Sequence, residues 1–293
     1  MKWKIGAVIT LAIFFSNYAY AKYTPSGQTP LTKRVDSIVH TIDANILQKK
    51  QQQKQVSQTT ESSKILSQSH ENAPIQNQHT VGQNNILNQP ANHLNQSVLL
   101  HVAAQSQNPE LYNGCEMTSL SMLLDAAGQS VDKMTLANEI PKDPTPEVLD
   151  SDGSIASWGD PNIGFVGDIT GNHVGYGVYH SPVFKLLDQI LPGKAIDLTG
   201  RSFEQILNQV ASGKPVIAWT TVNFAPTSSW VTWQGPNGPV HATLNEHVVL
   251  IVGFNNDQIF VNDPLDGTAA KAVNRAQFES SWEQLGQQAV SFN

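Results

Sequence analysis

A cysteine, a histidine and an aspartate are spaced along the chain in a way that could support nucleophilic catalysis. Cys115 follows Asn113-Gly114, opens a segment typical of a helix, and is the single cysteine among 293 residues. Unpaired backbone N–H groups and the dipole at a helix start favour a thiolate and lower the pKa of a cysteine there. Cysteine is also among the most often buried residue types, so position alone leaves a packing role equally open.

His247 is the candidate base, because it begins an apolar, β-branched run that predicts a buried strand over residues 247–254. Residues 255–257 predict a turn into a returning strand, which ends before Pro264. A hairpin folded about Asn255 or the following bond sets His247 opposite Asp263 or one place away, with opposed Cβ atoms roughly 5 Å apart. A carboxylate there would hold the tautomer of the imidazole and stabilise the imidazolium.

Other residues compete for these roles. Asn262 could orient the ring instead of Asp263, and since neighbouring strand residues point to opposite faces, only one of the two should reach it. His241 is an alternative base, although no carboxylate follows it at a comparable hairpin distance. Gln107, eight residues before the cysteine, could donate to a developing oxyanion together with the backbone N–H of the cysteine, and Gln105 is the alternative donor.

The elements that must position these residues follow from apolar periodicity and capping signals. Ser202 and Gln205 fit a capping box, and Gly128 should end the helix that carries the cysteine. Helices come first and strands later, which predicts an α+β fold rather than an alternating α/β fold. The predicted helices span residues 115–127, 132–140, 183–190, 202–211 and 277–287, and the predicted strands span 215–222, 247–254, 258–262 and 290–292.

Three segments are expected along the chain. Residues 1–21 have a basic start, a short apolar run and an A-x-A exit, as in a secretory signal peptide. Residues 22–97 are rich in Gln, Asn and Ser and predict a mostly disordered polar linker. Residues 98–293 predict the folded domain. Export makes an odd thiol a liability unless it has a use, which favours a reactive Cys115 in a secreted or cell-surface protein.

The charge balance excludes some partners. The chain has a formal net charge of -7, and residues 99–293 carry eight Lys/Arg against twenty Asp/Glu, a net of 8 − 20 = −12. An acidic domain repels phosphate backbones, so a nucleic-acid partner is not expected. No later stretch is apolar enough to cross a membrane, so no stable span is expected after signal cleavage. Neither a metal nor a cofactor is expected.

Two blocks of the sequence resemble the bacteriocin-processing-like cysteine peptidases of family 39, in their stand-alone exported branch. The blocks are QNPELYNGCEMTSLSMLLDAAG and EHVVLIVGFNNDQIFVNDP, and the resemblance covers roughly residues 98–293. It implies a papain-like fold in which a helix carrying the cysteine packs on an antiparallel sheet carrying the histidine and the aspartate. The family's nucleophile, base, orienting acid and oxyanion-hole glutamine match Cys115, His247, Asp263 and Gln107.

The expected function is therefore hydrolysis of peptide bonds in a peptide or protein substrate through an acyl-enzyme, without a metal. Two alternatives stay open. The same triad could cleave or transpeptidate the stem peptides of peptidoglycan, or the domain could be a non-catalytic cell-surface binding module that keeps the fold.

Overall fold

The computed structural model describes residues 97–293. The predicted signal peptide (1–21) and all but Ser97 of the predicted linker (22–97) lie outside the described residues. The helices are α3 (Cys115–Ala126), α4 (Lys133–Glu139), α5 (His180–Ile190), α6 (Phe203–Ala211) and α7 (Arg275–Gln284). The strands are β1 (Val98–Leu99), β2 (Lys142–Asp143), β3 (Val148–Leu149), β4 (Ile155–Ser157), β5 (Phe165–Gly167), β6 (Gly175–Gly177), β7 (Ala195–Asp197), β8 (Val216–Thr221), β9 (Val231–Gly235), β10 (Gly238–Ala242), β11 (Glu246–Phe254), β12 (Gln258–Asp263), β13 (Thr268–Asn274) and β14 (Ala289–Phe292).

A seven-stranded antiparallel sheet carries the candidate site. Its order is β13-β12-β11-β8-β14-β7, and β1 pairs with β11 in addition. β11 pairs with β8 and β12, and its residues 247–254 are all buried, as the continuous apolar run predicts. Gly253 is needed where β1 docks, since a Cβ there would lie 2.3 Å from the carbonyl oxygen of Val98. The predicted α+β fold, with the cysteine-bearing helix packed on an antiparallel sheet, is confirmed.

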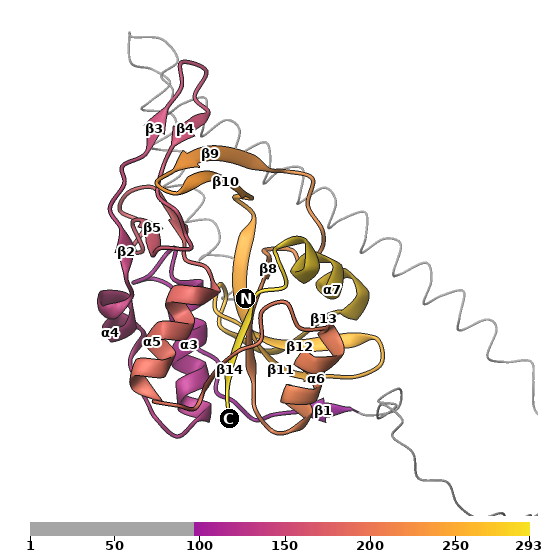
Figure 1. Cartoon of the computed structure of the whole chain (residues 1–293). Coiled ribbons are helices and arrows are strands. Elements are labelled where there is room, and N and C mark those ends of the chain that lie inside the picture. Colours follow the sequence, from indigo (N-terminus) through magenta and orange to yellow (C-terminus); the bar gives the residue numbers. More distant parts are fainter. Residues whose placement is uncertain (1–96) are drawn as a thin grey trace, which may run out of the picture. The chain divides into compact units, whose positions relative to one another are not determined.

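Alternate residues of β11 face two different cores. Val248, Leu250 and Val252 pack with residues of α3, α4 and α5. Val249 and Ile251 pack with residues of α6 and α7. Figure 1 shows the same division, with α3 and α5 on one side of the sheet and α6 and α7 on the other. From Val248 to Val252, successive residues of β11 therefore face opposite sides of the sheet.

Helix α3 is more deeply buried than its sequence predicts. The periodicity of Met117, Leu120 and Leu124 indicates one apolar face, but every residue from 115 to 124 is buried. The helix is enclosed by the sheet and by the other helices of its core, so its small polar residues are buried as well. Gly128 takes a φ of 77° just after the helix, the left-handed conformation that ends helices most readily with glycine.

The capping signals match the observed helix starts. Asp132 accepts a hydrogen bond from the backbone N–H of Met134 at 2.8 Å, and Ser202 and Gln205 form the predicted capping box of α6. Helix α5 begins at His180, three residues before the predicted start. Pro182 is tolerated there because a proline in the first helical turn loses no intrahelical hydrogen bond.

Two small sheets were not predicted. They have the orders β10-β9-β4-β3 and β2-β5-β6, and their strands are only two to five residues long. Trp158 and Trp233 pack together in a separate core beneath them, with ring centroids 5.8 Å apart. Strands this short carry too few residues for an alternating pattern to be recognised.

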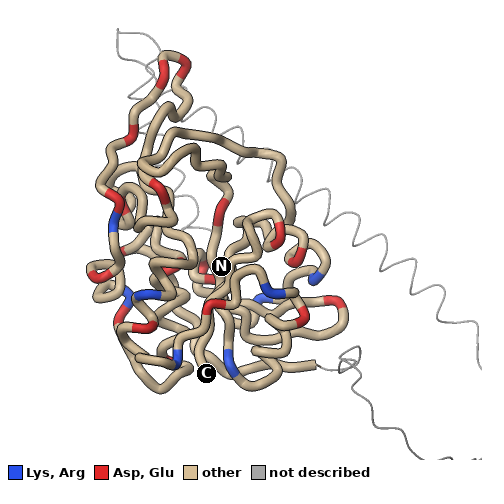
Figure 2. Tube along the Cα trace, viewed as in Figure 1, with Lys and Arg blue, Asp and Glu red and all other residues tan. Residues whose placement is uncertain are grey.

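Acidic residues outnumber basic residues in the described fold. Figure 2 shows acidic positions on many of its loops and strands, with few basic ones between them, in line with the eight cations and twenty acids of residues 99–293. Among residues 97–293, no helix combines the length and the hydrophobicity that a membrane span requires.

Candidate active site

Cys115 lies where the start of α3 meets the start of β11. The residue is 7% exposed, and the backbone N–H of Val248 approaches its sulfur. One turn along α3, the hydroxyl of Ser119 donates to the carbonyl oxygen of Val248 at 3.4 Å. Gly114, which precedes the cysteine, packs closely against Leu111, because a Cβ there would lie 2.6 Å from the Cβ of Leu111. The thiol therefore lies between the first turn of α3 and Val248 of β11.

Two glutamates flank the thiol. Cys115 Sγ donates to Glu116 Oε2 at 3.5 Å, and Glu116 Oε1 accepts the backbone N–H of Val178 at 2.7 Å. Potential ligand atoms of Cys115, Glu116 and Glu246 all lie within 4.8 Å of one another. The main chain leaves room for both carboxyls at Gly177, where a Cβ would lie 2.5 Å from Glu116 Oε1 and 3.3 Å from Glu246 Oε2.

These surroundings disfavour the thiolate in this structure. Burial raises the pKa of the Cys115 thiol well above its usual value, and a negative charge on either neighbouring carboxyl, Glu116 or Glu246, raises it further, while the N–H of Val248 lowers it. The net shift of this pKa is therefore opposite to the lowering that the helix start alone would produce. A helix dipole contributes only about 0.3–2 kcal/mol, which desolvation and two carboxyls together outweigh.

His247 and Asp263 form a buried pair. His247 Nε2 lies 2.8 Å from Asp263 Oδ1, and the side chains are 3% and 2% exposed. The other carboxylate oxygen accepts a short hydrogen bond from Lys271 Nζ, which also binds Asp266 at 2.7 Å. Burial alone would raise the pKa of Asp263, but the hydrogen bonds and charges of His247 and Lys271 hold it well below its usual value. The carboxylate is therefore an ionised acceptor for the imidazole.

The register of this pair differs from the prediction. Leu250 is paired with Asn262, so Asp263 lies beside Val249 rather than opposite His247 or one place away. The turn centres between Asn256 and Asp257, and β11 has an irregularity between Ile251 and Gly253. The two side chains meet diagonally on one face of the sheet, a geometry that long side chains can span.

His247 and Cys115 both lie near the start of β11, but no hydrogen bond joins their side chains. Within residues 97–293, no hydrogen bond joins Cys115 Sγ to the imidazole. The ring faces α7, with its centroid 6.3 Å from Phe224, which stacks on Phe278. Cys115 packs in the core on the other side of the sheet. They are nevertheless near along the strand, since His247 immediately precedes Val248, whose N–H approaches the sulfur.

Gln107 bridges the loop before Cys115 to the end of β12. Its side-chain Nε2 donates to the carbonyl oxygen of Tyr112 at 2.5 Å, and its backbone N–H donates to Pro264 O at 2.8 Å. The side chain is buried, and its Oε1 has no hydrogen-bond partner among the described residues. Gln105 instead binds Asp125 on the surface at 2.9 Å.

The rival bases and orienters lie elsewhere. Asn262 donates to Val102 O at 2.9 Å and accepts from Ala270 N at 3.0 Å, so it secures the incoming chain rather than the imidazole. His241 is exposed, stacks on Trp230 with ring centroids 4.8 Å apart, and its Nδ1 lies 3.0 Å from Thr232 Oγ1. Among the described residues, neither side chain forms a hydrogen bond with Cys115.

Sequence reasoning missed Glu116 and Glu246. Each is a charged residue next to a predicted site residue and at the edge of an apolar run, which is the signal that could have found them. Together with Cys115 they form the one group of three possible metal ligands found among residues 97–293. A single thiol with two carboxyls differs from the Cys/His sets of structural zinc and the all-oxygen sets of calcium, so we assign no metal to it.

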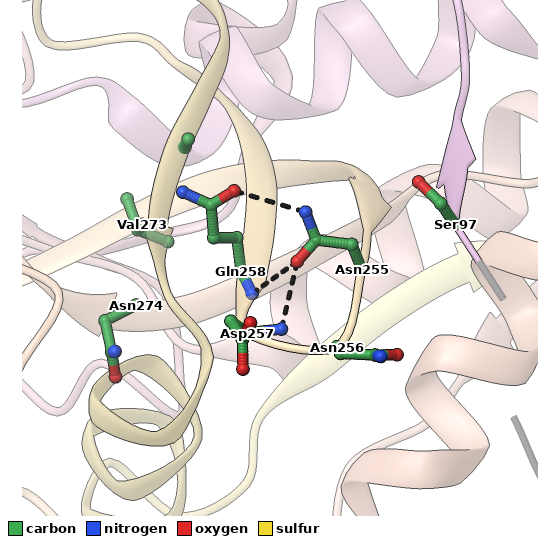
Figure 3. Close-up of a pocket in the computed structure, with 8 residues that line it drawn as sticks. Ser97, Asn255, Asn256, Asp257, Gln258, Val273 and Asn274 are labelled. Carbon is green, nitrogen blue, oxygen red and sulfur yellow. Dashed lines mark hydrogen bonds between the residues drawn. The ribbon is translucent and has the colours of Figure 1, made fainter. Parts of the chain in front are cut away.

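A cavity of about 540 Å³ lies beside strand β6. Tyr176 and Tyr179 line it, with their hydroxyls 3.0 Å apart, and they flank the Gly177-Val178 backbone that contacts Glu116. A second depression, of about 600 Å³, lies at the opposite end of β11, around the Asn255–Gln258 turn (Figure 3). Neither of these two depressions is lined by Cys115, His247 or Asp263.

Comparisons with known proteins agree with this architecture. Residues 99–290 match the model of the Peptidase_C39 like family. The chain is 42% identical over 186 residues to an uncharacterized protein, YvpB, of Bacillus subtilis (strain 168). The aligned region covers 64% of this chain and 71% of that protein. A crystal structure described as a C39-like peptidase from Bacillus anthracis matches with a TM-score of 0.62 and 44% identity, over 68% of this chain and 98% of that one.

The family match spans more than half of the chain, and the structural match includes the sheet and the cysteine-bearing helix. The chain therefore belongs to the Peptidase C39-like family.

Proposed function

We propose that this protein is an exported cysteine peptidase that hydrolyses peptide bonds through an acyl-enzyme on Cys115. Membership of a peptidase family supports a peptide substrate. The observation that carries the proposal is the buried contact between His247 Nε2 and Asp263 Oδ1, 2.8 Å long, at the start of the strand that also supports the sulfur. A buried imidazole held by an ionised carboxylate is the usual partner of a nucleophilic thiol.

The proposed chemistry is acyl transfer. The Cys115 sulfur attacks the scissile carbonyl, and the His247 imidazolium protonates the leaving amine. Water activated by the imidazole then releases the acyl group, while Asp263 stabilises the imidazolium. The Cys115 backbone N–H and the Gln107 side-chain amide are the proposed oxyanion donors. Catalytic hydrogen bonds are often formed only once substrate is bound, so substrate must bring the ring within reach of the scissile bond.

Export is part of the proposal and rests on the sequence pattern of residues 1–21. A thiol that works outside the cell must survive oxidants, and the 7% exposure of Cys115 protects it.

The test uses purified protein, a peptide library and peptidoglycan, with products read by mass spectrometry. Cys115→Ala should abolish hydrolysis without unfolding the domain, and His247→Ala should lower kcat/KM by about 10²-fold or more. His101→Ala, at an exposed histidine, is the matched control and should leave activity unchanged. Hydrolysis by Cys115→Ala at the wild-type rate would remove the peptidase assignment. Products from peptidoglycan alone would identify its stem peptides as the substrate.

A non-catalytic binding module is the second candidate function. The observation in its favour is the buried Cys115 thiol with a raised pKa and no hydrogen bond to His247. A folded wild-type protein that cleaves nothing in the library or in peptidoglycan would support it.

A further inference from the structure

We propose that Glu116 is a further catalytic residue, whose Oε2 takes the proton from Cys115 Sγ as the sulfur attacks the substrate. The inference rests on the proposed peptidase function and adds to it a proton acceptor other than His247. Glu116 Oε2 is the side-chain atom that accepts a hydrogen bond from the thiol, at 3.5 Å.

The carboxyl of Glu116 is held in this orientation. The residue is fully buried, and its second oxygen, Oε1, accepts the backbone N–H of Val178 at 2.7 Å. Gly177 provides the space, because a Cβ there would lie 2.5 Å from the same oxygen. One oxygen is thereby anchored to the main chain and the other is left for the sulfur.

Glu246 sets the charge state of this group. Glu116 and Glu246 lie within 4.8 Å of each other, and neither forms an ion pair with Lys or Arg in the described part of the chain. Two like-charged carboxyls this close do not ionise together, so one of them carries a proton. Burial raises the pKa of Glu116 to about 7, and burial together with the charge of Glu116 raises the pKa of Glu246 well above its usual value.

Glu116 is the member of the pair whose surroundings favour the carboxylate, because its Oε1 accepts the Val178 N–H, whereas Glu246 Oε1 has no hydrogen-bond partner among the described residues. A general base is most effective when its pKa lies near the operating pH. The other titratable groups around the pair are Tyr176 and Tyr179, besides the thiol itself. Burial raises the pKa of both tyrosines, so they stay neutral across the working range.

The proton balance closes over a full turnover. At the start Cys115 is a thiol, Glu116 a carboxylate and His247 an imidazolium. In acylation the S–H bond breaks, its proton passes to Glu116, the sulfur bonds the carbonyl carbon, and the imidazolium protonates the leaving amine. In deacylation His247 takes a proton from water, the resulting hydroxide displaces the sulfur, and Glu116 returns its proton to the sulfur.

The decisive variant is Glu116→Gln, which keeps the size of the side chain and an acceptor for the Val178 N–H. Removing a carboxylate beside the sulfur should lower the pKa of Cys115, so iodoacetamide labelling at pH 7 should become about tenfold faster if that pKa falls by about one. Loss of the proton acceptor should at the same time lower kcat/KM by about 10²-fold or more. Glu139→Gln, at an exposed glutamate of α4, should change neither quantity.

Faster labelling together with slower hydrolysis is the expected result. Faster labelling with unchanged or faster hydrolysis would overturn the proposal, since Glu116 would then only suppress ionisation of the thiol. A loss of both would overturn it as well, because Glu116 would then only position the thiol. Hydrolysis by Cys115→Ala is a different failure, that of the proposed function itself.

A second measurement needs no substitution at Glu116. If this carboxylate is the acceptor, the wild-type pH profile of kcat/KM should rise through an acidic limb near pH 7. A profile that is flat from pH 5 to pH 8 would overturn the proposal.

Discussion

His247 and Asp263 are joined at 2.8 Å although the backbone register sets them two residues apart. Asp263 uses the oxygen that faces the imidazole for a second contact, accepting the N–H of Leu265 at 3.0 Å, and offers the other oxygen to Lys271. The carboxylate is therefore fixed from three directions. His247 is left with Nδ1 as the ring nitrogen that can exchange a proton with substrate.

We predict that Asp263→Asn lowers kcat/KM on the order of 10³-fold, because an amide holds the ring but neither enforces its tautomer nor stabilises the imidazolium. Asp266→Asn is the matched control, since it removes the other carboxylate that binds Lys271 but none that binds His247. Its kcat/KM should stay within a factor of about two. An equal loss of kcat/KM in the two variants would contradict this, because it would show that the negative charge matters through Lys271 rather than through the imidazole.

The same carboxylate should make stability depend on acid pH. The folded-state pKa of Asp263 lies well below its usual value, so the folded protein binds this proton less readily than the unfolded chain does. Its stabilisation is fully present above the unfolded pKa, about 4, and is lost as the pH falls through the folded pKa. The difference in free energy of unfolding between wild type and Asp263→Asn, measured in urea, should shrink from pH 5 to pH 2. A constant difference would contradict this.

The sequence was sufficient for the elements with strong local signals. The caps at Asp132 and Ser202 and the glycine stop at Gly128 depend on neighbouring residues alone, and the structure has all three. The hairpin was placed about one residue off because its turn keeps Asn255 paired with Gln258 and because β11 is irregular before Gly253. A one-residue insertion of this kind leaves no mark in an apolar run.

The electrostatic character of Cys115 could not be read from its own position. The helix start argues for a thiolate, whereas the structure surrounds the sulfur with Glu116 from its own helix and Glu246 from a strand more than a hundred residues away. Which buried acids meet depends on tertiary packing. The two small sheets were missed for a related reason, since the β6 residues that make room for Glu116 belong to a three-residue strand.

Wild-type Cys115 should react slowly with iodoacetamide at pH 7. Its pKa is raised, so only a small fraction is thiolate at neutral pH, and the rate should climb only in alkaline solution. The comparison is with the same protein in denaturant, where the thiol regains an ordinary pKa and labels faster. Rapid labelling of the folded protein at pH 5–6 would instead indicate a thiolate–imidazolium pair in the resting state.

Gly177→Ala tests whether the space beside the carboxyl pair is required. The added Cβ would lie 2.5 Å from Glu116 Oε1, so it should displace this carboxyl from the Val178 N–H. Gly238→Ala is the matched control, since Gly238 has a similar φ of 130° against 147°, but open space around the added atom. Both variants should suffer the same backbone strain. The free energy of unfolding of Gly177→Ala, measured in urea, should be about 1–3 kcal/mol lower than that of Gly238→Ala, and its kcat/KM should also be lower. Equal stability and activity in the two variants would mean that the Glu116 carboxyl moves aside without cost and that its position next to the sulfur is incidental.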